Sequence, residues 1–179
     1  MIKQLFERYR DTPSDIYGHL QYMHDLCVEL GATSVVELGV RTGVSTAAFL
    51  AAMEHNGGRV WSADIDQPRV DPIIADHPCW QFVWGDDLEI VDLAPEADIV
   101  FIDTSHAYQH TLDELDAYSP KARQVILLHD TQLEQPEGLT NQPPFPVRKA
   151  CLEWLDSNPG WVWNEFEHCY GLGVIRRTM

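Results

Sequence analysis

SVVELGVRTGVST, at residues 34–46, places a short apolar strand, a glycine-containing turn and a helix start directly after one another. The first part of this run is rich in β-branched residues, which favour a buried strand. Gly39 and Gly43 permit a tight turn, and Ser45 or Thr46 opens a run of helix-forming apolar residues. A strand–loop–helix unit of this kind points backbone N–H groups at one place, where anionic groups of a ligand bind.

The spacing within the loop disfavours a dinucleotide ligand. Dinucleotide-binding loops carry G-x-G-x-x-G, in which the middle glycine lets the backbone approach a pyrophosphate. Here the register is Glu37-x-Gly39-x-x-x-Gly43, and Arg41 stands at the position of that middle glycine. We therefore do not expect NAD or FAD in this loop. An ordinary tight turn of an α/β protein is the structural alternative.

Further apolar strands follow along the chain, and each is succeeded by polar residues suited to binding a ligand. Strands are expected at residues 59–64, 80–84, 98–103 and 124–130, with helical or broken helical segments between them. This repeated strand–helix pattern predicts parallel pairing with right-handed crossovers. Ligands bind such sheets at the carboxyl ends of the strands, so the residues at those ends are the candidate site residues.

Two segments are expected to frame the sheet. Within a helical cover formed by residues 1–31, an amphipathic helix over residues 12–31 is predicted to begin at an N-cap in Thr12-Pro13-Ser14-Asp15. Residues 132–146 contain several prolines and predict a loop. A loop of this length is functional or mobile in most compact domains, so we interpret it as a substrate-side flap, with an unimportant surface excursion as the alternative.

Taken in order, the strand ends resemble the motifs of class I S-adenosylmethionine (SAM) methyltransferases. Glu37-x-Gly39-x-x-x-Gly43 resembles the first motif, and Asp64 and Gly85-Asp86 follow the second and third strands as in that family. Two later segments resemble a small-molecule O-methyltransferase group related to cephalosporin hydroxylase-like and macrolide-sugar methyltransferases. These segments are Phe101-Ile102-Asp103-x-x-His106-x-Tyr108 and Leu127-Leu128-His129-Asp130-Thr131.

The resemblance covers nearly the whole chain and implies its fold. The expected architecture is α/β, with a Rossmann-like, doubly wound, seven-stranded sheet that is mostly parallel and has an antiparallel last strand. A hairpin formed by residues 161–163 and 173–175 resembles the last two strands of this fold. Residues 1–179 are accordingly expected to form a single methyltransferase domain.

The resemblance also implies a SAM site. Asp64 closes the second strand, where related folds place the carboxylate that binds ribose hydroxyls, and it is preferred to Asp66 for that reason. Asp86 or Asp87 is expected to meet the adenine amino group. The implied cofactor-binding residues are Glu37, Gly39, Arg41, Thr42, Gly43, Ser45, Asp64, Asp86 and Asp87.

Methyl transfer to oxygen requires an acceptor that is aligned with the sulfonium methyl group and deprotonated. Asp103, His129 and Asp130 are the candidate metal ligands. Their oxygens suit Mg²⁺, whereas the imidazole, standing where the group often has a carboxylate, suits Mn²⁺, Fe²⁺ or Zn²⁺ better. If no metal binds, His106 is the candidate general base, and Asp103 is the second catalytic residue. The structural alternatives are a helix-capping His106 and a buried His129 bonded to a backbone carbonyl.

Composition limits the class of partner. The chain has 179 residues and a formal net charge of −16, which disfavours nucleic acid and anionic membranes. No apolar run approaches the roughly 18 residues that span a bilayer. The four cysteines form no C-x-x-C pair, and no signal peptide is visible, so a reduced, cytoplasmic protein is the simplest interpretation.

We therefore expect a SAM-dependent methyltransferase acting on a hydroxyl of a small molecule, such as a sugar or a polyketide. The alternatives are a SAM-binding protein of the same fold without methyl transfer, either a hydroxylase-like relative or a regulatory subunit, and an NAD enzyme. Arg41 disfavours the last. A homo-oligomer is left open, since Trp161 and Trp163 fit either an interface or the core.

Overall fold

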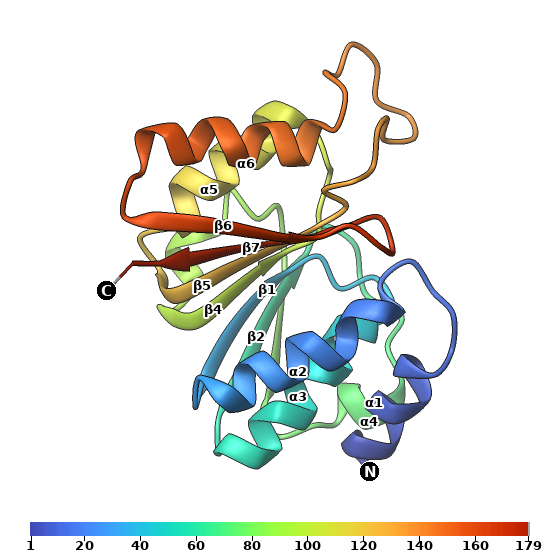
Figure 1. The fold of residues 1–179 in the computed structure, drawn as a ribbon. Helices are drawn as coiled ribbons and strands as arrows, with labels where there is room; N and C mark the ends of the chain where they lie inside the picture. The colour runs from blue at the N-terminus through green and yellow to red at the C-terminus, as the bar shows by residue number, and fades with distance from the viewer. Residues whose placement is uncertain (179) are drawn as a thin grey trace.

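A seven-stranded sheet with helices on both faces organises residues 1–178, which the computed structural model describes (Figure 1). The strand order is β3-β2-β1-β4-β5-β7-β6. Neighbouring strands from β3 to β5 pair in parallel, and β7 pairs antiparallel with both β5 and β6. This confirms the predicted sheet and its antiparallel last strand. The strands are β1 Ser34–Leu38, β2 Arg59–Asp64, β3 Trp80–Trp84, β4 Ala97–Ile102, β5 Ala122–His129, β6 Trp161–Phe166 and β7 Leu172–Arg177.

The helices form one layer on each face of the sheet. In Figure 1, α1 to α4 lie on one side of the sheet, and α5 and α6 lie side by side on the other. The helices are α1 Ile2–Arg10, α2 Leu20–Glu29, α3 Val44–Asn56, α4 Pro72–Ala75, α5 Tyr108–Tyr118 and α6 Pro146–Ser157, with 3₁₀ turns at Tyr17–His19 and Val91–Leu93. Among residues 1–178, none of these helices is long and apolar enough to cross a membrane.

Each face of the sheet has its own hydrophobic core. Along β4, Ile99 and Phe101 pack with the α1–α3 layer, whereas Val100 and Ile102 pack with the α5–α6 layer. Successive strand residues point to opposite faces, so a strand covered on both sides must be apolar throughout. This is why the central strands are visible in the sequence as continuous apolar runs.

The N-terminal cover differs from the prediction. The helix expected over residues 12–31 is wrong in its first part, because residues 12–16 are irregular and α2 begins only at Leu20. Asp15 does not cap it: its carboxylate pairs with Arg41 across 2.6 Å, and Ile16 beside it is buried. Tertiary contacts therefore override the local capping signal. The helix α1 lies within the predicted helical cover of residues 1–31 but was not predicted as a separate helix; it buries Ile2, Leu5 and Phe6 along one side.

Two other expectations concern the C-terminal part. Residues 132–145 contain no helix or strand, as predicted, and Gln142 Oε1 accepts a hydrogen bond from the Tyr108 N–H at the start of α5. The two hairpin tryptophans are partly buried and pack against the α5–α6 core. Trp161 lies 6.1 Å from Trp154 between ring centroids, and Trp163 covers Gly173. These contacts favour the core-packing alternative.

Strand register brings the ends of the central strands to one level. Leu38 of β1 pairs with Ile102 of β4, and Ile102 pairs with Leu128 of β5. The residues that follow these three therefore lie side by side at the carboxyl edge. Gly39 approaches Asp103 so closely that a Cβ on it would lie 1.9 Å from the Asp103 carbonyl oxygen.

Replacing Gly39 with alanine is expected to destabilise the fold strongly. Gly39 has φ +88°, so alanine adds backbone strain to the clash with Asp103. Gly57→Ala is the matched control, because Gly57 has φ +75° and nothing within 4 Å of its Cβ position among the described residues. In urea unfolding we expect a loss of about 1 kcal/mol for Gly57→Ala and about 3 kcal/mol or more for Gly39→Ala. Equal losses would contradict the close approach.

Candidate functional site

A cavity of about 950 Å³ opens at the carboxyl edge of the sheet. Its wall is formed by the loops that follow β1, β2, β3 and β4, and by Asp130 after β5. The N-terminal segment contributes Asp15 and Ile16. Its size falls within the range of pockets that bind small molecules and cofactors. The strand ends chosen from the sequence are thus brought to one site.

The buried carboxylate of Glu37 supports the loop after β1. Glu37 is fully buried, and its oxygens accept hydrogen bonds from the hydroxyls of Ser45, Thr46 and Ser62 at 2.6–2.9 Å. Burial raises the pKa of Glu37 to about 7, although the three hydroxyl donors oppose this shift. Glu37 therefore supports the loop and the start of α3 but does not form part of the cavity wall.

Asp64, at the end of β2, fixes the same loop at Val40 and Arg41. Its Oδ2 accepts hydrogen bonds from the N–H groups of Val40 at 2.8 Å and Arg41 at 3.0 Å, and its Oδ1 accepts one from Asp66 N at 2.9 Å. Arg41 has φ +49°, a left-handed conformation that is uncommon for a residue with a side chain. The carboxylate thus joins two loops at the rim of the cavity, where it lines the wall.

The two acids after β3 have different environments. Asp86 Oδ1 accepts a hydrogen bond from Leu88 N at 3.0 Å and closes the local turn. The Asp87 side chain is 12% exposed and lies with Oδ1 3.2 Å from Nε2 of His110 on α5. Both residues line the cavity. Asp86 is therefore the better candidate for an adenine contact, because Asp87 already has a charged partner.

Four titratable side chains meet where β4 and β5 end. Nε2 of His106 lies 3.2 Å from Asp103 Oδ1 and 3.0 Å from Asp130 Oδ2. Nδ1 of His129 lies 3.5 Å and 3.4 Å from the same two oxygens. His106 and Asp130 have φ +57° and +60°, so two residues of this cluster adopt backbone conformations that cost energy. Because its side chain turns to the two carboxylates, His106 is not the helix cap considered as an alternative.

The two histidines and the two carboxylates of this cluster shift one another's pKa. Burial alone would lower the pKa of both histidines, but the Asp103 and Asp130 carboxylates more than offset it, raising the pKa of His106 to about 9 and that of His129 to about 11. For Asp103 and Asp130, burial acts to raise the pKa, and the two histidines reverse this effect and lower it. The cluster as described is therefore two imidazolium–carboxylate pairs.

The donor set fits a divalent cation. Asp103, His129 and Asp130 each offer one ligand atom, and these atoms lie within 4.8 Å of one another. Nε2 of His129 lies 3.0 Å from the Cys169 carbonyl oxygen and must carry a proton to donate to it. A neutral His129 would then present the lone pair of Nδ1 to the two carboxylates, which is how metal-binding histidines are commonly oriented. The alternative of a carbonyl-bonded His129 is therefore compatible with metal binding.

Most of the predicted site residues reach the cavity wall. Those that line it are Gly39, Arg41, Thr42, Ser45, Asp64, Asp86, Asp87, Asp103, His106 and Asp130. Glu37, Gly43 and His129 do not line the cavity themselves but lie next to residues that do. The sequence reasoning missed Asp15 and His110. For His110 a signal existed, since Glu114 follows it by four residues and the two share one side of a helix.

Comparison with protein families identifies one match, and it covers the segment that supplies most of the cavity wall. A family model described as a methyltransferase domain matches residues 36–131. This segment runs from β1 to the residue after Asp130, and so includes every strand end described above. No curated protein matches the chain.

Solved structures share the fold over nearly the whole chain. An O-methyltransferase from Bacillus cereus in complex with S-adenosylhomocysteine (SAH) has a TM-score of 0.72 and 16% identity, covering 99% of this chain and 89% of that chain. The O-methyltransferase TomG from Streptomyces achromogenes, in complex with SAM, has a TM-score of 0.69 and 14% identity, covering 94% and 82%. The MycE methyltransferase of the mycinamycin biosynthetic pathway, in complex with Mg, SAH and mycinamycin VI, has a TM-score of 0.72 and 16% identity, covering 98% and 54%.

The support that Glu37 gives to the loop is expected to weaken as the pH rises. Its folded-state pKa of about 7 lies above the ordinary value of 4.5, so its stabilising contribution is complete below pH 4.5 and is lost as the pH passes 7. We expect the stability of the wild type, relative to Glu37→Gln, to fall by about 2 kcal/mol between pH 5.5 and pH 8. Urea unfolding of both proteins at the two pH values measures this, and a constant difference would contradict it.

Proposed function

The chain belongs to the methyltransferase domain family, and on this basis we propose that it transfers the methyl group of SAM to a hydroxyl oxygen of a small molecule. One observation carries the proposal. A single cavity is lined by two groups of residues. Gly39, Asp64 and Asp86 stand where the family resemblance places SAM-binding residues. Asp103 and His106 belong to the acid–histidine cluster. A methyl donor and an acceptor could therefore meet there. The SAM, SAH and mycinamycin VI bound in the related structures support this choice of cofactor and substrate class.

The proposed cofactor site uses charge and backbone geometry together. SAM carries a sulfonium and an ammonium group, and the cavity wall offers the carboxylates of Asp64, Asp66 and Asp86. Asp64 is the proposed ribose acceptor, because its rim position is fixed by two loop N–H groups. Asp86 is the proposed adenine contact, and the loop at Gly39–Ser45 surrounds the remainder of the cofactor.

The proposed chemistry takes place at the other end of the cavity. The acceptor oxygen must lose its proton as it attacks the methyl group. His106 in its neutral form is the proposed proton acceptor, at Nε2. Because the Asp103 and Asp130 carboxylates raise its pKa to about 9, the fraction of His106 that can act as a base increases as the pH rises towards 9. A divalent cation held by Asp103, Nδ1 of His129 and Asp130 would lower the pKa of a bound hydroxyl. Asp103 would take part in both arrangements, as the neighbour of the His106 imidazolium or as a ligand of the cation.

SAH binding measured by calorimetry tests the cofactor assignment. We expect micromolar binding to the wild type and a loss of about 10- to 100-fold in Asp64→Asn, because this change removes a charged acceptor for the ribose. Asp66→Asn is the comparison variant, for which we expect a smaller loss, since Asp66 is the exposed acid two positions away. A larger loss in Asp66→Asn would transfer the ribose role to Asp66. Absence of SAH binding by the wild type would overturn the proposed function.

His106→Ala is expected to lower turnover while leaving SAH affinity unchanged. Loss of a general base reduces rates by about 10²- to 10⁴-fold, whereas the proposed SAM contacts lie elsewhere on the wall. The measurement is SAH formation from SAM with a panel of sugar and polyketide hydroxyl acceptors, in EDTA and in Mg²⁺ or Mn²⁺. His55→Ala, at an exposed histidine, is the control. Unchanged turnover in His106→Ala would exclude His106 from the mechanism.

A further inference from the structure

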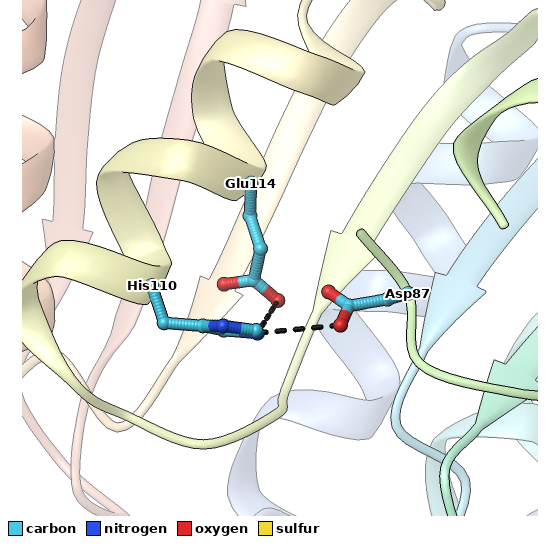
Figure 2. A group of neighbouring side chains, drawn as sticks. All are labelled: Asp87, His110 and Glu114. Atoms are coloured by element: carbon cyan, nitrogen blue, oxygen red, sulfur yellow. Dashed lines mark ion pairs between the residues drawn. The ribbon is translucent and has the colours of Figure 1, made fainter. Parts of the chain in front are cut away.

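A second acid–histidine cluster lies between α5 and the loop after β3 (Figure 2). His110 and Glu114 come from consecutive turns of α5, and Asp87 faces them from the loop. Nε2 of His110 lies 3.2 Å from Asp87 Oδ1 and 3.5 Å from Glu114 Oε1. The proposed methyl-transfer chemistry makes no use of this cluster.

Two carboxylate oxygens of the cluster are buried without a hydrogen-bond partner in the described part of the chain. They are Asp87 Oδ2 and Glu114 Oε2. The Glu114 side chain is 1% exposed, and its other oxygen accepts a hydrogen bond from the Thr104 hydroxyl at 2.5 Å. Figure 2 shows the carboxylate of Glu114 directed toward His110, and that of Asp87 toward both of them. Leaving such an oxygen unpaired is costly, and each of the two belongs to a carboxylate that faces the cluster (Figure 2), so the pair of carboxylates points to a bound positive charge.

We propose that Asp87, His110 and Glu114 bind a divalent transition-metal cation, Zn²⁺ or Mn²⁺, at a site separate from the Asp103, His129 and Asp130 cluster. Each residue offers one ligand atom, and the three atoms lie within 4.8 Å of one another. The two separations from His110 Nε2, 3.2 and 3.5 Å, are close to the ligand–ligand distance of about 3.3 Å around an ion with bonds of about 2.0–2.1 Å. Two carboxylates with one imidazole favour these ions over Mg²⁺.

An ion could reach this site from the large cavity. Asp87 and His110 line the cavity, whereas Glu114 closes the site from behind. The remaining coordination positions would face the cavity and hold water. Since Asp87 follows Asp86 directly, the ion would fix the loop after β3 against α5, beside the proposed adenine contact. The site itself does not depend on the proposed function.

Zn²⁺ and Mn²⁺ titrations by calorimetry test this proposal, with the first cluster disabled. In the Asp103→Asn/Asp130→Asn background we expect one remaining site per chain and an increase in melting temperature on adding Zn²⁺. Adding Asp87→Asn or His110→Asn should weaken binding by at least about 100-fold and abolish that increase. His55→Asn in the same background should change neither.

Two results would overturn the site. One is absence of Zn²⁺ and Mn²⁺ binding in the folded Asp103→Asn/Asp130→Asn background. The other is binding that survives both Asp87→Asn and His110→Asn, which would assign the ion to other histidines. Asp87→Asn serves as a second variant because Asp87 is a loop residue, so its amide replaces the carboxylate without altering α5. Circular dichroism of each variant confirms that the comparison is made between folded proteins.

Discussion

The contact between Gly39 and the backbone of Asp103 is the constraint on which the site depends. The Asp103 N–H donates to the carbonyl of Leu38 at 2.8 Å, and no side chain at position 39 separates the two strand ends. The glycine loop that would surround the cofactor therefore abuts the residue that belongs to the acid–histidine cluster. A donor bound in the loop and an acceptor bound at the cluster would be held at the short separation that methyl transfer requires.

Much of this arrangement could be predicted from the sequence. The central strands are buried on both faces, so their apolar runs mark them within one or two residues, and parallel pairing places their ends at one edge. That is why Asp64, Asp86, Asp103 and Asp130 were predictable as wall residues. The groups that these residues contact could not be predicted as well. Asp64 contacts loop N–H groups and Asp87 contacts α5, and both contacts depend on loop conformation, which the spacing of residues does not determine.

The failures also have physical causes. The capping signal at residues 12–15 predicted a helix start, but Asp15 is held by Arg41 and Ile16 by the core, so tertiary contacts decide that segment. The pKa of His106 could not be anticipated either. An isolated histidine titrates near neutral pH, whereas here two carboxylates stabilise its charged form, and only the meeting of β4 and β5 reveals them.

His129 connects the ends of the chain to the chemistry of the cavity. Its Nε2 is anchored by the carbonyl of Cys169 in the turn between β6 and β7, and the ring of His19 packs against it edge-on at 5.9 Å between centroids. Burial lowers the pKa of His19 to about 4, so His19 stays neutral and adds no charge beside His129. The antiparallel hairpin and the N-terminal cover thus fix the direction of Nδ1. Elements that contribute little to the wall determine which atom of His129 the two carboxylates meet.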